Sequence, residues 1–265
     1  MGKPRLEFWA LRADLREPGL RIVVNGRGTE EWPGNPDTPA AEGAGNAAPA
    51  GLIPSTRVSG FVEAYNCLAG INTNPFSPVS AKVGERRSID GLAIADGTLV
   101  SLPNPHFDAL VFYRDPESGD GDSGIRAAIV SQALLGMEEP QQITHAAGGF
   151  HIVLRDGLVP ESVEKRSRAR HPRSAAGLSP DGRTLYLLVV DGRRLGSIGV
   201  TETELGVMLK RLGASEGLNF DGGGSSVLAL RYGDGKVRPV NTPIHRGIPG
   251  RERGVATCLG IRAEP

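Results

Sequence analysis

The chain is poor in residues on which several functional classes depend. Aromatic residues make up 5% of its 265 residues, so platforms on which sugars could stack are scarce. Lys and Arg together number 30, and so do Asp and Glu, which leaves a formal net charge of zero. This balance excludes the broad basic field that recruits nucleic acid. Any anion must therefore be recognised by a local group of residues.

Cysteine and long apolar segments are scarce as well. Cys67 and Cys258 are the only cysteines, which excludes a disulfide scaffold and a cysteine-type metal site. Two buried free thiols or one disulfide are the alternatives for this pair. No apolar run approaches the length that crosses a bilayer. Residues 1–4 do not resemble a signal peptide, so we expect either a cytoplasmic protein or a mature form that has lost its signal.

Glycine and proline are abundant, with 37 and 20 residues, which indicates many turns rather than a helical bundle. Residues 6–25 predict two short strands. Residues 26–55 are rich in Gly, Pro, Ala and Asn and predict a long, partly disordered surface loop. A strand is predicted at 107–113, whereas the apolar run 125–137 is compatible with a strand or a helix.

The C-terminal part has the clearest patterns. The continuous apolar run 184–190 predicts a central strand that is buried on both faces. Thr201 and Glu204 have capping-box spacing, and apolar residues at helical spacing lead to Gly213, which predicts a helix at 202–212.

Short strands at 217–220 and 254–261 and a hairpin within 226–241 complete the pattern. Strands dominate, and one strand–helix–strand crossover is expected. We therefore predict a single α+β domain over residues 1–265, with mixed, mainly antiparallel sheets flanked by a few helices.

The strongest chemical feature is the turn Asp221-Gly222-Gly223-Gly224-Ser225-Ser226, which follows the strand at 217–220. Consecutive glycines allow the backbone to approach a ligand closely. The Gly222 and Gly223 amides and the hydroxyls of Ser225 and Ser226 are donors suited to an anion or to sugar oxygens. An isolated turn of this kind is more often a tight turn capped by its aspartate.

A second carboxylate, Asp191, follows the strand at 184–190. Carboxylates at the ends of strands that flank one crossover can face one cleft, and a carboxylate pair is the usual equipment for glycoside hydrolysis. We therefore predict that Asp191 and Asp221 act together. The alternative is that Asp191-Gly192 is a simple turn.

Arginine and asparagine supply the remaining candidates. Arg173 and Arg253 lie just before predicted strands, and arginine binds phosphate through two parallel hydrogen bonds. Asn66 and Asn241 could donate to sugar hydroxyls. The alternatives are surface salt bridges for the arginines and turn contacts for the asparagines.

Residues 173–257, including the Asp221 turn, resemble the phosphodiester glycosidase family. Weaker similarity reaches upstream. Asn66, in the segment Ala-Tyr-Asn-Cys, is aligned with an Asn-Gly-Gly motif of the family, and Gly148-Gly149 resembles a later glycine pair. Cys67-Leu68 and Phe150-His151 depart from the family pattern beside these two motifs, which bears on the identity of the sugar.

The resemblance implies hydrolysis of the C1–O bond of a sugar-1-phosphodiester, such as an N-acetylglucosamine-1-phospho group or a related cell-envelope glycan. Arg173, with Arg253 as second candidate, would hold the phosphate. Asp221 and Asp191 would act as nucleophile or base and as stabiliser of the sugar cation, in either order. The two glycine motifs, the serines and the asparagines would bind the substrate.

The resemblance also implies that no cofactor is required. No metal ligands are predicted, and a structural divalent cation stays open. An exported or lumenal location is implied, with the cytoplasm as alternative. Oligomeric state is not predicted.

Two other functions fit the same residues. A phosphodiesterase that cuts the P–O bond would use the same arginines but normally needs metal ligands, which the sequence lacks in recognisable spacing. A non-catalytic glycan-binding module would be expected to expose aromatic platforms, and the chain has few aromatic residues.

Overall fold

The computed structural model describes residues 5–26, 51–80, 82–115, 118–119, 122–135, 143–166 and 168–264. Most of the predicted loop at 26–55 lies outside these residues. Its last part is not a loop, because β3 (Leu52–Pro54) pairs with β6 (Arg86–Ile89) and the Ile53 side chain is buried.

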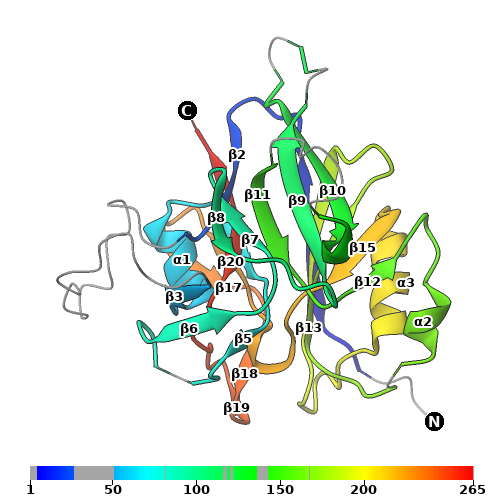
Figure 1. The fold of residues 1–265 in the computed structure, drawn as a ribbon. Coiled ribbons are helices and arrows are strands. Elements are labelled where there is room, and N and C mark those ends of the chain that lie inside the picture. Colours follow the sequence, from blue (N-terminus) through cyan, green and yellow to red (C-terminus); the bar gives the residue numbers. More distant parts are fainter. Residues whose placement is uncertain are drawn as a thin grey trace.

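Three five-stranded sheets form the body of the protein (Figure 1). In spatial order, the first sheet contains β1 (Phe8–Asp14), β14 (Thr184–Val190), β13 (Arg173–Leu178), β15 (Glu216–Asn219) and β12 (His151–Leu154). The second contains β10 (Ile125–Ser131), β9 (Asp108–Arg114), β11 (Ile143–Gly148), β7 (Ala93–Ala95) and β8 (Thr98–Ser101). The third contains β17 (Val237–Pro239), β16 (Leu228–Arg231), β4 (Ala69–Asn72), β20 (Cys258–Ala263) and β2 (Leu20–Val24).

Smaller elements connect and flank these sheets. They are the strands β5 (Phe76–Ser77), β18 (Ile244–His245) and β19 (Ile248–Pro249), the helices α1 (Val58–Ala64), α2 (Glu161–Glu164) and α3 (Glu202–Leu212), and the 3-10 turns η1 (Gln132–Leu134) and η2 (Gly223–Ser225). The ambiguous run at 125–137 begins as strand β10 and continues into η1. Strands outweigh helices, so the predicted α+β class holds in a form dominated by sheets.

The sheets were predicted to be mixed and mainly antiparallel. Within the described part of the chain, each pairing between neighbouring strands of the three large sheets is antiparallel. The crossover through α3 joins β14 to β15, but β13 lies between these two strands and pairs with both. The carboxyl ends of β14 and β15 therefore lie at the same end of the sheet as the start of β13.

The core joins the inner faces of all three sheets. All seven residues of β14 are buried, as the continuous apolar run predicts. One apolar cluster runs from Leu187 on β14 through Phe112 on β9 to Ile261 on β20. Cys67 and Cys258 belong to this cluster as free thiols, and burial raises the pKa of Cys67 to about 12.

Helix α3 packs against the outer side of the first sheet through a second apolar cluster that includes Leu205 and Leu209 (Figure 1). Helix α3 has the predicted bounds, residues 202–212. The Thr201 hydroxyl accepts from the Glu204 amide, and the Glu204 carboxylate accepts from the Thr201 amide, which completes the capping box. Gly213 ends the helix with a left-handed φ of 106°. None of the helices in the described residues is long and apolar enough to cross a membrane.

The capping box gives a test of how this crossover is stabilised. Replacing Thr201 with Ala removes the acceptor for the Glu204 amide, so the free energy of unfolding should fall by about 1 kcal/mol. Thr203→Ala, inside the same helix, is the matched control and should change stability by less than about 0.5 kcal/mol. Urea denaturation measures both. Equal effects of the two substitutions would contradict a capping contribution from Thr201.

Candidate active site

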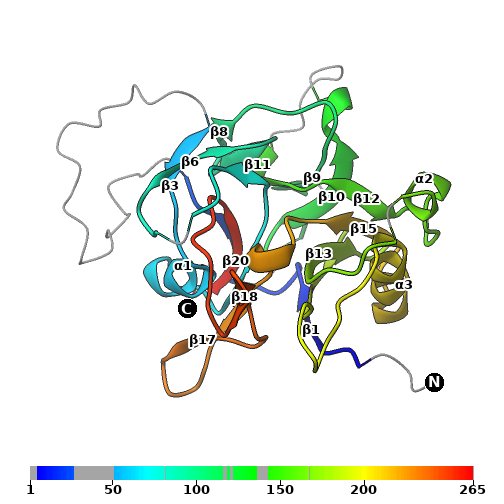
Figure 2. The ribbon, with the colours of Figure 1, turned by 90° about the horizontal axis from the view of Figure 1, so that it is seen from below.

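The ends of β14 and β15 meet the start of β13 at one end of the sheet, which brings three predicted residues together. Figure 2 shows β13 and β15 side by side. Val190 at the end of β14 pairs with Arg173 at the start of β13, and Asn219 at the end of β15 pairs with Ala175. Asp191 and Asp221 follow the ends of β14 and β15 in the chain, on either side of Arg173. The predicted convergence of two strand ends is therefore observed, although it arises across an intervening antiparallel strand.

The backbone of Pro172 lies between the two Asp-Gly turns. A Cβ on Gly192 would stand 2.7 Å from the Pro172 nitrogen, and one on Gly222 would stand 2.9 Å from the Pro172 oxygen. That same oxygen accepts a 2.9 Å hydrogen bond from the Gly223 amide. Gly223 has a left-handed φ of 63°, which favours glycine. The glycines are needed because three backbone segments meet here without room for side chains.

Asp221 lies where the glycine turn begins. Its Oδ1 accepts from the Gly222 amide at 2.9 Å, and the Ser225 hydroxyl also hydrogen-bonds to its carboxylate. Burial raises the pKa of Asp221 above its ordinary value, while Ser225, Arg253 and the Gly222 amide act in the opposite direction. An aspartate with a raised pKa accepts a proton more readily, which suits acid–base chemistry.

Arg253 approaches the same turn from the segment before β20. Its Nη1 donates to the Ser225 Oγ at 3.1 Å, and its Nε donates to the His245 Nδ1 at 3.1 Å. His245 is buried, and burial together with the neighbouring Arg253 lowers its pKa, which favours the neutral ring. A neutral ring with its proton on Nε2 can accept from arginine at Nδ1. Asp221, Ser225, Arg253 and His245 thus form one connected row.

A second arginine at the turn, Arg193, was missed by the sequence reasoning. Arg193 follows Gly192 and has a left-handed φ of 60°. A Cβ on Gly223 would stand 3.0 Å from its Nη2, just as one on Gly224 would stand 2.5 Å from the Nη2 of Arg253. The two guanidinium groups therefore flank consecutive glycines. The signal in the sequence was its position directly after the Asp191-Gly192 turn.

These two arginines differ from Arg173 in how their charge is balanced. Arg173 Nη1 lies 3.3 Å from Glu202 Oε1, and both side chains are largely buried. Among the residues that the structure describes, neither Arg193 nor Arg253 has a carboxylate oxygen within 4.0 Å. Their charge is available to an anion bound at the glycine turn, whereas that of Arg173 is already paired.

Asp191 holds the framework of the site. Its side chain is 1% exposed, and its Oδ2 lies 2.5 Å from Arg194 Nη2. Oδ1 accepts from Asn241 Nδ2 at 2.9 Å, and the Thr242 amide donates to both oxygens. The Asp191 carboxylate is thus filled by donors of the framework, and a catalytic role for it beside Asp221 stays a prediction.

Asn241 and Ser226 belong to the same framework. Asn241 Nδ2 also donates to the Ser226 carbonyl at 3.0 Å, and its Oδ1 accepts from the Leu228 amide at 3.1 Å. Asn241 therefore ties the loop after β17 to the backbone that leaves the glycine turn. Ser226 is buried, with its main-chain oxygen used in this contact.

The structure places Asn72, rather than the predicted Asn66, against the turn. Asn66 is an exposed residue after the end of α1, and its amide donates back to Glu63. Asn72 is buried at the end of β4, where its Nδ2 donates to the Asp221 carbonyl at 2.6 Å. The Asp221 amide donates to the Thr73 carbonyl at 2.8 Å. The missed signal was the polar run Asn72-Thr73-Asn74 at the end of a strand.

Gly148 and Gly149 pack against the segments that contain Asn74 and Asn219. The Gly148 amide donates to Asn74 Oδ1 at 3.0 Å, and a Cβ on Gly149 would stand 2.7 Å from the Asn219 carbonyl. The glycine pair therefore permits close packing of β11 against the strand that leads to Asp221. Within the described residues, no group of three or more His, Cys, Asp or Glu side chains is arranged to hold a metal ion.

Comparison with known proteins shows what the chain is similar to. SPbeta prophage-derived uncharacterized protein YomE of Bacillus subtilis (strain 168) is 33% identical over 112 residues, which cover 36% of this chain. The chain thus spans only a small part, 17%, of that relative.

Solved structures share the fold. The zebrafish N-acetylglucosamine-1-phosphodiester alpha-N-acetylglucosaminidase catalytic domain, auto-inhibited by its pro-peptide, superposes with a TM-score of 0.61 at 18% identity, covering 99% of this chain and 85% of that one. A Burkholderia pseudomallei protein thought to be exported superposes with a TM-score of 0.65 at 16% identity, covering 96% of this chain and 73% of that one. Finally, the family model for phosphodiester glycosidases matches residues 65–262. The chain therefore belongs to the phosphodiester glycosidase family.

Proposed function

We propose that this protein hydrolyses the C1–O bond of a sugar-1-phosphodiester. The observation that carries the proposal is the pair of arginines, Arg193 and Arg253, that flank the glycine turn beside Asp221 and have no paired carboxylate among the described residues. A phosphodiester carries one negative charge, and arginine binds phosphate oxygens through directed hydrogen bonds.

In this proposal the residues divide the work. Arg193 and Arg253 bind the phosphate together with the amides of the glycine turn, while Arg173 is largely buried and paired with Glu202. Asp221 acts at the anomeric carbon. Asp191 and Asn241 keep the two turns in place, as their filled hydrogen bonds indicate.

The reaction balances with Asp221 as base. The Asp221 carboxylate takes a proton from water, and the water oxygen forms a bond to C1 of the sugar. The C1–O bond breaks, and its electron pair stays with the phosphate oxygen, which leaves as a phosphomonoester. The arginines neutralise the charge that builds up on this leaving group, so strong protonation by a second carboxylic acid is not needed.

The proposed sugar and the proposed cellular location are inferred from structural neighbours. The zebrafish neighbour is named for N-acetylglucosamine-1-phosphodiester, and the Burkholderia neighbour is thought to be exported. We propose an N-acetylglucosamine-1-phospho group or a related cell-envelope glycan as substrate, and an exported location.

The bond that breaks can be identified with isotopic water. Hydrolysis of a panel of sugar-1-phosphodiesters in oxygen-18 water should place the label in the released sugar, because water attacks C1. Mass spectrometry of both products measures this. Label in the phosphate would overturn the proposal in favour of a phosphodiesterase that cuts the P–O bond.

Substitutions at the two aspartates should separate catalysis from framework. Asp221→Asn should reduce kcat/KM by at least about 100-fold, because the base is lost. Asp191→Asn should instead lower the free energy of unfolding by about 1–3 kcal/mol, because the donors of Arg194, Asn241 and Thr242 lose a charged acceptor. Equal loss of stability in both variants would contradict this division.

The raised pKa of Asp221 predicts the pH dependence of its cost to stability. Between its ordinary value of 3.8 and its raised folded-state pKa, the folded protein binds more protons than the unfolded chain. Stability therefore falls as pH rises through this window, and the ionised carboxylate is destabilising above it. Asp221→Asn should be more stable than the parent at pH 7, and denaturation should show this advantage fading as pH falls towards 3.8. An advantage that grows on acidification would contradict the shift.

Gly224 tests the role of Arg253 without altering its charge. Gly224→Ala would place a methyl group 2.5 Å from Arg253 Nη2, and the flexible guanidinium would be displaced. KM for a sugar-1-phosphodiester should rise at least about tenfold while the fold is retained, as steady-state kinetics and circular dichroism would measure. Gly233→Ala is the control, because a Cβ there meets nothing within 4 Å. Unchanged KM in Gly224→Ala would argue against phosphate binding by Arg253.

A further inference from the structure

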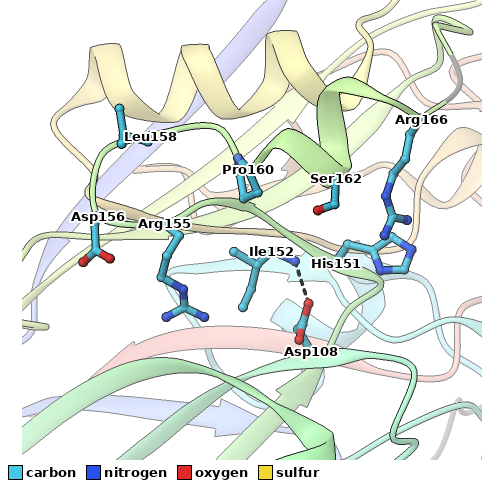
Figure 3. Close-up of a pocket in the computed structure, with 9 residues that line it drawn as sticks. All are labelled: Asp108, His151, Ile152, Arg155, Asp156, Leu158, Pro160, Ser162 and Arg166. Atoms are coloured by element: carbon cyan, nitrogen blue, oxygen red, sulfur yellow. Dashed lines mark hydrogen bonds between the residues drawn. The ribbon is translucent and has the colours of Figure 1, made fainter.

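A recess lies next to the candidate active site, along the edge strand β12. It has a volume of about 500 Å³ and is bounded by β12, the start of β9 and α2 (Figure 3). Ile152, Leu158 and Pro160 give it an apolar wall, while Asp108, Arg155 and Ser162 bring polar groups to it. None of these residues has a part in the chemistry proposed above.

One end of this recess adjoins the active site. His151 lines the recess and pairs with Asn219, two residues before Asp221. Glu202 connects the two regions, because its Oε1 lies 3.3 Å from Arg173 Nη1 and its Oε2 lies 4.0 Å from Arg166 Nε at the recess. A ligand that extends from the glycine turn past Arg173 would thus reach the recess at His151 and Arg166.

Positive and negative side chains are equal in number along the recess, in contrast to the glycine turn: Arg155 and Arg166 are matched by Asp108 and Asp156. Arg155 also pairs with Glu216 at 2.7 Å, and Arg166 Nε lies 4.0 Å from the Glu202 carboxylate that Arg173 shares. Burial and the nearby Arg166 lower the pKa of His151, which keeps the ring neutral near pH 7. The residues that line the recess therefore carry no net positive charge that would bind a second anion.

The remaining chemistry matches an uncharged sugar ring. A sugar presents hydroxyl groups around its edge and C–H groups on its faces, so it fits a recess that combines an apolar wall with a few donors and acceptors. Ser162 and the arginines are donors, and the Asp108 carboxylate, which accepts from the Ile152 amide at 2.7 Å, has further acceptor capacity. The rings of Phe107 and Phe150 pack around the His151 ring, with centroids 6.4 and 6.2 Å from it, at the end of the recess nearest the active site.

We propose that this recess binds a second, uncharged sugar unit of the substrate. The inference rests on the proposed function and extends it: the substrate is a glycan of at least two sugar units that carries the phosphodiester, rather than a single sugar phosphate. The glycine turn selects the phosphate, and the recess selects the neighbouring sugar.

Binding of phosphate-free disaccharides to the intact protein tests this without requiring turnover. The probes are N,N′-diacetylchitobiose, maltose, cellobiose and mannobiose, titrated while backbone amide NMR signals are followed. At least one should shift the signals of residues 151–162. Ser162→Trp, which fills the recess from its exposed helix, should weaken that binding at least about tenfold. Glu164→Trp, also exposed on α2 but outside the recess, is the matched control and should bind as the parent does.

The outcomes separate this inference from the proposed function. Disaccharide binding that Ser162→Trp abolishes supports the recess even if no phosphodiester is hydrolysed. Hydrolysis of a sugar-1-phosphodiester, with no shift at residues 151–162 from any probe, overturns the recess and leaves the proposed function intact. Equal weakening by Ser162→Trp and Glu164→Trp also overturns it.

Discussion

The site depends on a backbone contact, the close approach of Pro172 to the turns after β14 and β15. Because β13 lies between those strands, the residue before it stands between Gly192 and Gly222. Its carbonyl accepts from the Gly223 amide, which sets the direction of the glycine turn. The orientations of Asp221, Arg193 and Arg253 follow from this contact, since each side chain lies on or against the two turns.

Charge is distributed unequally around that contact. Asp191 and Arg173 are buried and paired, with Arg194 and Glu202 respectively, so their charges mainly hold elements together. Asp221, in contrast, pays a desolvation cost that raises its pKa, and Arg193 and Arg253 lack salt-bridge partners in the described residues. Arg193 is exposed and Arg253 partly buried, so both charges can be reached by a bound anion. The glycine turn is where such an anion would complete the balance.

The recess along β12 has the opposite character. Its arginines face carboxylates, and its wall is partly apolar. Two adjoining regions, one with surplus positive charge and one without, are suited to a ligand that is anionic at one end and neutral at the other. The shared element is Glu202, which contacts arginines of both regions and lies in the first turn of α3. The capping box at Thr201 therefore stabilises a helix end that also serves the site.

Local patterns in the sequence were sufficient for features that local chemistry determines. The capping box and Gly213 defined α3, and the apolar run defined β14, since each depends on residues within one turn or strand. The glycine motif with Asp221 indicated the candidate site in the same local way. Pairing between distant strands was decided by the tertiary structure. That pairing placed β13 between β14 and β15, filled Asp191 with donors from Arg194 and the segment at 241–242, and brought Asn72 instead of Asn66 to Asp221. These outcomes depend on burial and long-range hydrogen bonds, which single-sequence spacing does not encode.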